Sequence, residues 1–130
     1  MSKVIWKAGL PAFLFFFGVL GAASAQDLII SELMAVNNGT IEDEDGNTPD
    51  WLELFNAGDS AQNLSGYFLS DDPLVPEKWR FPSVSIAPGG FLLIFASDKD
   101  RRDANSELHT NFKLSSSGEF LGLFAPDGET

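Results

Sequence analysis

The chain has 130 residues, of which 19 are Asp or Glu and 8 are Lys or Arg, and its formal net charge is −11. Phosphate backbones repel a chain this acidic, so we expect no direct nucleic-acid binding. The chain has no Cys, which excludes disulfide bonds, a cysteine nucleophile and a lipid-anchored cysteine.

The first 25 residues have the three-part pattern of a secretory signal peptide. Lys3 and Lys7 make a basic start, residues 8–20 are apolar, and Ala23-Ser24-Ala25 is a small-residue cleavage site. The apolar run has 13 residues, fewer than the roughly 20 that cross a bilayer as a helix. We therefore predict that residues 1–25 are a cleaved signal peptide and that the mature protein is not held in a membrane.

Residues 26–130 form the expected mature chain, which is long enough for one domain with a modest core. Losing two lysines with the signal peptide takes the net charge from −11 to −13. The signal peptide predicts a secreted protein, located in the periplasm, on the cell surface or outside the cell. The absence of Cys in an exported chain favours a bacterial source and leaves packing to stabilise the fold.

The mature chain consists of short apolar runs separated by turn-forming residues rich in Gly, Pro, Asn and Asp. No run has a sustained apolar period of about 3.6 residues, so we expect no long helix. Many short strands at regular spacing predict an all-β sandwich. The expected strands are Leu28–Ala35, Trp51–Phe55, Gly66–Ser70, Lys78–Phe81, Phe91–Ala96, Asn111–Leu114 and Phe120–Phe124.

Two of these strands are apolar on both faces, which is typical of strands inside a sheet. They are the strand that begins at Trp51 and the strand Phe91–Ala96. We expect Trp51 to pack in the core of the sandwich, with Phe91, Leu93 or Phe95 among its neighbours.

Four segments of the mature chain carry a resemblance to a known family. They are "IISELMAVN", "DGNTPDWLELFNAGDSAQNLSGYFLSDD", "KWRFPSVSIAPGGFLLIFAS" and "LHTNFKLSSSGEFLGLFAPDG". The second is the most specific, because it joins an Asp-Trp-x-Glu-Leu strand, an asparagine turn and a Leu-Ser-Gly motif. In this order and spacing, the four segments resemble the lamin tail domain over nearly the whole mature chain.

This resemblance implies an immunoglobulin-like β-sandwich of short, mostly antiparallel strands. The family is not known for a shared catalytic activity, and its domains act as scaffolding and interaction modules. Bacterial members occur in secreted proteins, commonly beside other extracellular modules that include enzymes. The resemblance therefore implies an interaction domain, and it does not identify the partner.

The residues themselves indicate no enzyme. The single His, His109, stands where a strand begins, and we interpret it as a strand-edge residue instead of a general base. Glu32 and Glu53 lie inside apolar strands and could form a carboxylate pair for acid–base chemistry. We favour the alternative that each accepts hydrogen bonds or meets a basic residue at a sheet margin, because a buried carboxylate needs a partner.

The acidic stretch "EDEDGNTPD", residues 42–50, is the candidate metal site. Asp43, Asp45, Asn47 and Asp50 recur at spacings that could wrap one Ca²⁺ ion, which takes six to eight oxygen ligands. The fit to an EF-hand loop is poor, since there is no third ligand before the glycine and no glutamate at the twelfth position. The alternative is a solvated acidic turn in which Asp50 caps backbone N–H groups.

Two function classes remain open from the sequence. The first is a non-catalytic interaction or scaffold module of a secreted bacterial protein, with a protein or an extracellular polymer as partner. The second is an accessory domain that binds calcium, or carbohydrate through calcium, and positions a neighbouring enzyme. No other cofactor is expected.

The end of the sequence predicts a longer natural product. Pro126-Asp127-Gly128 is a turn signal, and a turn normally returns the chain into another strand. Without that strand, Phe120–Phe124 would leave a row of backbone groups unpaired unless it lies between two earlier strands. We therefore expect the chain to continue past Thr130 and to be the N-terminal module of a longer protein.

Overall fold

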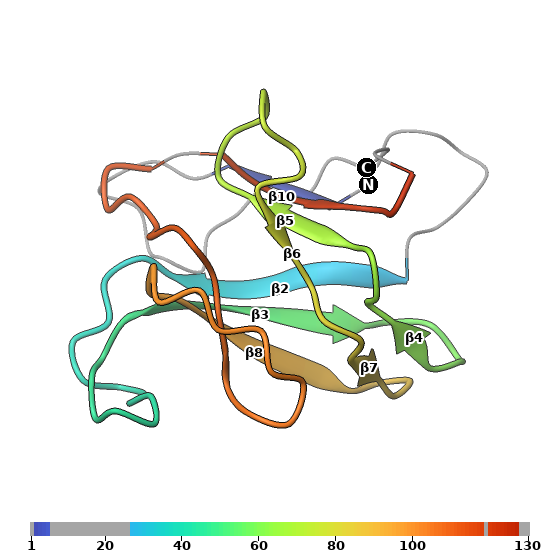
Figure 1. Cartoon of the computed structure of the whole chain (residues 1–130), viewed down its shortest axis with the longest axis horizontal. Coiled ribbons are helices and arrows are strands. Elements are labelled where there is room, and N and C mark those ends of the chain that lie inside the picture. The colour runs from blue at the N-terminus through green and yellow to red at the C-terminus, as the bar shows by residue number, and fades with distance from the viewer. Residues whose placement is uncertain (1, 6–26, 119, 128–130) are drawn as a thin grey trace.

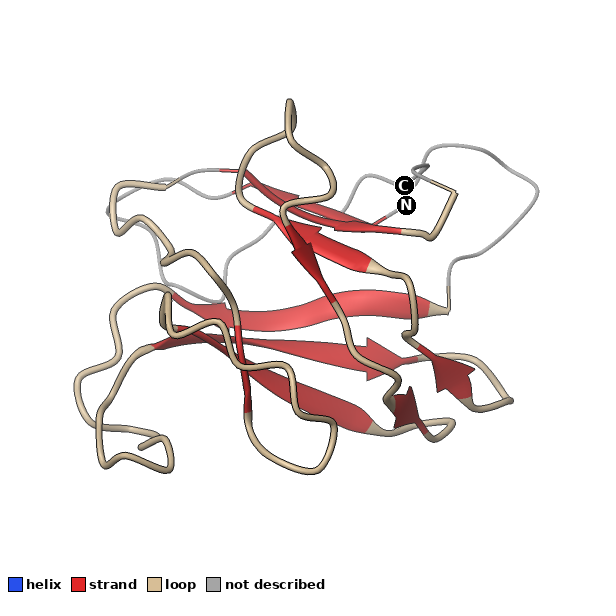
Figure 2. Cartoon of the chain, in the orientation of Figure 1, coloured by secondary structure: helices blue, strands red, loops and turns tan. Residues whose placement is uncertain are grey.

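The computed structural model describes residues 2–5, 27–118 and 120–127, and within them every regular element is a β-strand (Figure 2). The all-β prediction is therefore confirmed. The strands are β1 (Ser2–Ile5), β2 (Leu28–Met34), β3 (Asp50–Asn56), β4 (Gln62–Asn63), β5 (Phe68–Ser70), β6 (Trp79–Arg80), β7 (Ser85–Ile86), β8 (Phe91–Ala96), β9 (Leu108–His109) and β10 (Phe120–Phe124).

Two four-stranded sheets form the layers of the sandwich (Figure 1). One sheet has the strand order β1-β10-β5-β6 and the other has the order β2-β3-β8-β9, while β4 and β7 form a separate short pair. Every pairing is antiparallel except that of β8 with β9. The architecture agrees with the predicted immunoglobulin-like sandwich of mostly antiparallel strands.

The hydrophobic core lies between the two sheets, where alternate side chains of each strand point inward. In β3 these are Leu52 and Leu54, both fully buried, and in β8 they are Ile94 and Ala96. Leu121 and Leu123 of β10 face them from the other sheet as members of the same cluster. The rings of Trp79 and Phe81 in this cluster meet edge to face, with their centroids 4.9 Å apart. The cluster contains Leu28, Ile30, Leu33, Ala35, Leu52, Leu54, Leu64, Leu69, Trp79, Phe81, Ile86, Ile94, Ala96, Leu108, Phe112, Leu114, Leu121 and Leu123.

Trp51 is buried, but on the opposite face of its sheet from the main cluster. It is 5% exposed, and its cross-strand partner on β8 is Phe95, as the sequence predicted. Leu52 belongs to the cluster between the sheets, and successive side chains alternate, so Trp51 faces outward. The expectation that Trp51 packs in the core between the sheets is therefore wrong about the face and right about the burial.

The expected strand Asn111–Leu114 is not a strand in the structure. The chain pairs earlier instead, through β9, and only an isolated bridge joins Lys113 to Ser97. Side-chain hydrogen bonds fix this segment in another shape: Thr110 Oγ1 donates to Phe112 O at 2.7 Å, and Asn111 Nδ2 donates to Lys78 O at 2.8 Å. Short polar side chains here compete with the sheet ladder for backbone partners.

Glu32 and Glu53 lie directly opposite each other on β2 and β3. A bulge between Ile30 and Glu32 shifts the register and places them in this position. Glu32 is exposed and Glu53 half-buried, and Ser31 Oγ donates to Glu53 Oε1 at 3.2 Å. The pair therefore lies on a solvated sheet face, which suits the hydrogen-bond-accepting role and offers no enclosed site for acid–base chemistry.

The predicted signal peptide, residues 1–25, lies outside the described residues except for Ser2–Ile5. Those four residues form β1, which pairs with one side of β10, while β5 pairs with the other side. In the structure Phe120–Phe124 thus lies between two earlier strands, with β1 opposite Phe120–Leu123 and β5 opposite Gly122–Phe124. Within the described ranges no helix has the length and apolar character needed to cross a membrane.

Candidate functional site

The acidic stretch before β3 folds into a tight turn around Asp43. Asp43 Oδ1 accepts hydrogen bonds from the backbone N–H groups of Asp45 and Asn47, at 3.0 and 2.9 Å. The turn is closed by Asp43 N donating to Asn47 O and by Gly46 N donating to Asp43 O. Gly46 has φ of +77°, a conformation that glycine adopts without steric cost. The turn carries the carboxylates at positions 43 to 45 at fixed positions.

Lys99, from the segment that follows β8, inserts its ammonium group into this turn. Lys99 Nζ donates to Asp43 Oδ2 at 2.5 Å, to Asp45 Oδ2 at 2.8 Å and to Asn47 Oδ1 at 2.9 Å. Asp43 has no exposed side-chain surface, so its charge is neutralised inside the protein. Three of the four predicted calcium ligands therefore converge on one cationic atom, the Lys99 ammonium.

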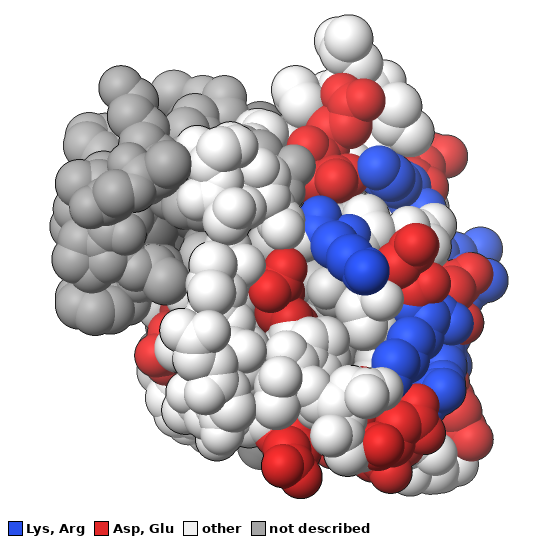
Figure 3. Space-filling view, turned by 90° about the vertical axis from the view of Figure 1, so that its left-hand side faces the viewer, with Lys and Arg blue, Asp and Glu red and all other residues white. Residues whose placement is uncertain are grey.

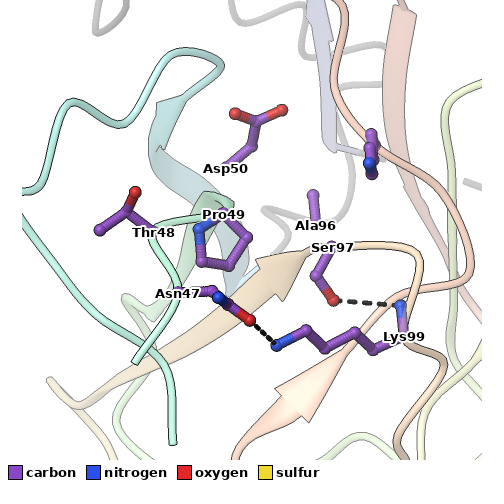
Figure 4. Close-up of a pocket in the computed structure, with 8 residues that line it drawn as sticks. Asn47, Thr48, Pro49, Asp50, Ala96, Ser97 and Lys99 are labelled. Carbon is purple, nitrogen blue, oxygen red and sulfur yellow. Dashed lines mark hydrogen bonds between the residues drawn. The ribbon is translucent and has the colours of Figure 1, made fainter. Parts of the chain in front are cut away.

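The fourth predicted ligand, Asp50, lies apart from the other three. It begins β3 and lines a pocket of about 340 Å³, and its carboxylate points away from the Lys99 ammonium (Figure 4). The other residues that line this pocket are Asn47, Thr48, Pro49, Ala96, Ser97, Lys99 and Lys113. Burial raises the pKa of Asp50 to about 6, against the opposing influence of the Leu114 backbone N–H and the Lys113 charge.

A second layer of ion pairs surrounds Glu44. Arg101 Nη1 donates to Glu44 Oε1 at 2.6 Å, and Arg101 Nη2 donates to Asp45 Oδ2 at 2.8 Å. The backbone N–H of Glu44 donates to Glu107 Oε1 at 2.6 Å. We use the name charged cluster for Asp43, Glu44, Asp45, Asn47, Lys99, Arg101, Glu107 and His109. Figure 3 shows Lys and Arg side chains interspersed among Asp and Glu on one side of the molecule.

His109 links the charged cluster to the end of β8. Its Nε2 lies 2.9 Å from Glu44 Oε2, and its Nδ1 lies 2.7 Å from Ser97 Oγ. The ring is fully buried and stacks on Phe95, with the two ring centroids 5.2 Å apart. His109 is the last residue of β9, which is an edge strand of its sheet, so its position agrees with the strand-edge interpretation.

Ser97, His109 and Glu44 have the residue types of a hydrolase triad, but their surroundings differ from those of a nucleophile and its base. Ser97 is itself buried, and its Oγ also accepts the backbone N–H of Lys99 at 3.1 Å. Both ring nitrogens of His109 have protein partners. These bonds hold the Lys99 segment against β9, a structural role that requires no contact with a substrate.

The pKa values of the charged cluster follow from these contacts. Burial raises the pKa of Asp43, but hydrogen bonds from Lys99, Asn47 and Asp45 together outweigh it and lower the pKa below its ordinary value. The pKa of Lys99 is raised by its hydrogen bonds to Asp43 and Asp45. Asp43 and Lys99 are therefore both charged at neutral pH, and their charges compensate each other.

The two glutamates of the cluster have opposite pKa shifts. Contacts of Glu44 with Glu107, His109 and Arg101 lower the pKa of Glu44, although burial opposes them. The pKa of Glu107 is raised, chiefly by its hydrogen bond with Glu44. Two adjacent carboxyl groups avoid full repulsion when one of them holds its proton more tightly.

Among the described residues, one group of His and carboxylate side chains has ligand atoms close enough to hold a metal ion. The atoms belong to Asp43, Glu44 and His109 and lie within 4.8 Å of one another. Each of the three side chains already has a protein partner, namely Lys99, Arg101 or Ser97. An ion bound here would compete with Lys99 and Arg101 for the carboxylates of Asp43 and Glu44.

Sequence reasoning found the acidic half of the charged cluster and missed the basic half. The signal was present, because Lys99, Arg101 and Arg102 are three of the six Lys or Arg residues that follow Gln26. The separation of more than 50 residues between the two halves hides their contact from any local pattern. The backbone around Lys99 also has an uncommon conformation, because Asp98 and Asp100, which flank Lys99, have positive φ of 67° and 52°.

A family model described as Lamin Tail Domain matches residues 21–130. Neither the curated proteins nor the solved structures contain a match to the chain. The match covers the complete sandwich apart from β1, and it includes both halves of the charged cluster.

Proposed function

Because the chain belongs to the lamin tail domain family, whose members are immunoglobulin-like interaction domains, we propose that it is a non-catalytic binding module of an exported bacterial protein. The partner is a protein or an extracellular polymer, and residues 1–25 are removed as a signal peptide during export. The charged cluster supports the non-catalytic part of this proposal, since its titratable side chains already bind one another.

The observation that carries the proposal is the loop between β5 and β6, which projects from the sandwich (Figure 1). In this loop Leu74 is 88% exposed and Val75 is 47% exposed. Contact of large apolar side chains with water is unfavourable, so free energy is gained when a partner covers them. Two prolines, Pro73 and Pro76, flank the pair and restrict its backbone.

Hydrogen bonds within the β5–β6 loop also hold its shape. Asp72 Oδ1 accepts the backbone N–H of Leu74 at 2.9 Å, and Asp72 O accepts that of Val75 at 3.0 Å. At its base, Lys78 Nζ donates to Asp71 Oδ1 at 2.6 Å. A loop held in one shape loses little conformational entropy on binding, which favours a role in recognition.

The export step is tested by N-terminal sequencing of the protein recovered outside the cytoplasm. We expect the first residue to be Gln26. An intact Met1 on membrane-retained material would contradict export with cleavage.

The binding step is tested by co-sedimentation of the processed protein with intact cells of the source organism and with their insoluble surface polymer. We expect saturable binding that Val75→Asp weakens by tenfold or more, since a buried charge opposes association. Val36→Asp is the matched control, because Val36 has a similar exposed fraction of 53% at another position. If the wild type and Val75→Asp bind equally well, the β5–β6 loop is not part of the contact surface.

Calcium binding is the second candidate function, and one observation favours it. Oxygens of Asp43, Asp45 and Asn47 converge on a single cationic atom, so the turn has the geometry to gather donors around a positive charge. A ligand that binds only the folded state raises the melting temperature. Under this candidate, millimolar calcium raises the melting temperature of the wild type, and Asp45→Ala abolishes the increase.

The variant Lys99→Met tests whether calcium can take the place of the Lys99 ammonium in the acidic turn. If the turn binds calcium in competition with Lys99, removal of the ammonium increases the calcium-dependent rise in melting temperature. A melting temperature that calcium changes in neither protein would leave Lys99 as the cation of this turn and reject calcium as a ligand.

A further inference from the structure

The pocket beside Asp50, of about 340 Å³, opens at one end of the sandwich core (Figure 4). It lies where β3 begins and β8 ends, because Asp50 and Ala96 are cross-strand partners and both line it. Its volume falls within the range of about 300–1,000 Å³ that is common for pockets that bind small molecules. The residues that line it include none from the β5–β6 loop, so this pocket is separate from the contact surface proposed above.

Asp50 occupies a position on β3 that the alternation of side chains assigns to the core. Leu52 and Leu54, two and four residues further along the same face, are fully buried members of the core cluster. The position before them on that face carries a carboxylate instead, and the neighbouring strand carries the small side chain of Ala96. An apolar side chain at position 50 would extend the core, whereas the acid and the alanine together leave a hollow with a charged wall.

The protein compensates the charge of the Asp50 carboxylate incompletely. Burial raises the pKa of Asp50 to about 6, and the Leu114 backbone N–H and the Lys113 charge oppose this effect only in part. Lys113 acts by charge alone, without a hydrogen bond to the carboxylate. The ionised group therefore destabilises the fold at neutral pH. A carboxyl group with a raised pKa that lines a pocket is typical of a functional site.

Three further polar groups of the pocket wall are available to a ligand. Asn47 Oδ1 accepts a hydrogen bond from Lys99 Nζ at 2.9 Å, which leaves the Nδ2 group as a donor. In the described part of the chain, neither Asn47 Nδ2 nor Thr48 Oγ1 has a hydrogen-bond partner, and the Lys113 ammonium has no ion pair. The wall thus offers an amide donor, a hydroxyl group and an ammonium group in addition to the carboxylate.

We propose that this pocket binds one unit of a neutral carbohydrate, whose hydroxyl groups donate hydrogen bonds to the Asp50 carboxylate. Asn47 Nδ2 and Lys113 Nζ donate to oxygens of the sugar, and Thr48 Oγ1 donates or accepts. The site uses no metal ion, so it differs from calcium binding by the acidic turn. It also stands without the β5–β6 loop, and it adds a carbohydrate site to the binding function proposed above.

The charges of the pocket wall favour a neutral ligand over an ion. A cationic ligand that approached Asp50 would also meet Lys113, and an anionic ligand that approached Lys113 would meet Asp50. Lys99 adds no free charge, because its ammonium group is already bonded to three acceptors. Sugars match both signs, since each hydroxyl group donates and accepts hydrogen bonds. Pro49 and Ala96 add apolar surface, which suits the C–H groups of a sugar ring.

The test is an NMR titration of the isotope-labelled protein with glucose, galactose, mannose and N-acetylglucosamine, in a buffer that contains a metal chelator. For at least one of these sugars we expect saturable shifts in the millimolar range, confined to the residues that line the pocket. The absence of saturable shifts with all of these sugars, or shifts located elsewhere, would overturn the proposal. Glycine is the control for a small zwitterion, and shifts with glycine but with no sugar would also overturn it.

Asp50→Asn separates recognition from folding. The variant keeps the size of the side chain and should weaken sugar binding by about tenfold or more, because hydrogen bonds to a charged group are the stronger ones. It should be no less stable than the wild type, since the ionised carboxyl group costs stability at neutral pH. Asp59→Asn is the matched control, because Asp59 is exposed beyond the other end of β3, and it should bind like the wild type. Unchanged binding by Asp50→Asn would reject the proposal.

Thr48→Val gives a second measurement at a side chain with no structural hydrogen bond to lose in the described part of the chain. Valine keeps the shape of threonine and lacks the hydroxyl group, so we expect sugar binding to weaken severalfold with no change in the urea midpoint. A variant that binds as tightly as the wild type would contradict the contact of Thr48 with the sugar.

The failure of this proposal is distinguishable from the failure of those above. Val75→Asp, which tests the β5–β6 loop, should leave sugar binding unchanged because Val75 does not line the pocket. Loss of sugar binding in that variant would contradict a separate site. Sugar binding that appeared only after calcium replaced the chelator would support the calcium candidate and overturn a metal-free pocket.

Discussion

The interior between the two sheets and the charged cluster stabilise the same fold in different ways. In the interior, Leu54 and Leu121 are fully buried and contribute through the removal of apolar surface from water. In the charged cluster, Asp43 and Lys99 contribute through hydrogen bonds whose value depends on geometry, ionisation and salt. The interior should therefore respond to changes in volume, and the cluster to changes in charge and pH.

The largest effect is expected in the interior. Leu54→Ala removes a side chain with no exposed surface and should lower the free energy of unfolding by about 2–5 kcal/mol. Leu74→Ala makes the same chemical change at a side chain that is 88% exposed and should alter stability by less than about 0.5 kcal/mol. Urea unfolding measures both variants, and similar midpoints would contradict the assignment of the core.

A smaller loss is expected when the charged cluster loses its central cation. Lys99→Met leaves the buried Asp43 carboxylate with backbone donors only and should cost about 1–2 kcal/mol at neutral pH. Lys113→Met removes the same charge at an exposed position and should cost less. If the two variants unfold at the same urea concentration, the Lys99 contacts do not stabilise the turn.

Lys99→Met should also change the response to acid. The pKa of Asp43 is lower in the folded protein than its ordinary value of 3.8, so Asp43 stabilises the fold above that pH, and this contribution disappears as the pH falls below it. The wild type should therefore lose stability in acid more steeply than Lys99→Met. Thermal melts from pH 5 down to acid would measure the two slopes, and parallel curves would contradict the role of the ion pair.

Asp50 should respond to pH in the opposite direction. Its pKa is raised from 3.8 to about 6, so the folded protein holds this proton more tightly than the unfolded chain, and stability decreases as the pH rises from about 4 to 6. Asp50→Asn should remove that decrease and stabilise the protein at neutral pH by about 1 kcal/mol, discounted for the partly exposed carboxyl group. A variant with the same pH profile as the wild type would show that Asp50 is not the group that titrates.

The smallest effect is expected at the rim of the charged cluster. Arg101 pairs with Glu44 and Asp45, but its side chain is 41% exposed, so water and salt weaken both ion pairs. Arg101→Ala should shift the urea midpoint less than Lys99→Met does. The difference from wild type should vanish in about 1 M salt, where the Debye length falls to about 3 Å. A shift that persists in high salt would indicate that Arg101 contributes through packing.

The sequence predicted the strands that are long and apolar more accurately than the segments between them. Phe91–Ala96 and Phe120–Phe124 were predicted with the bounds that the structure shows, because a short continuous apolar run bounded by turn residues is a local pattern. The two-residue strands at Gln62, Ser85 and Leu108 leave no such pattern. The strand expected at Asn111–Leu114 is absent because two side-chain hydrogen bonds hold the backbone in another shape: a local bond from Thr110 to Phe112 and a long-range bond from Asn111 to Lys78.

The sequence by itself therefore determined the fold class, the family and the acidic half of the charged cluster, because strand periodicity, turn residues and charge runs are properties of short segments. Only the tertiary structure decided which face Trp51 occupies, that Asp50 stands apart from Asp43, and that Lys99 and His109 reach the acidic turn. These depend on the pairing of β3 with β8 and of β8 with β9. Contacts between residues more than 50 positions apart arise from that packing, and no local pattern records them.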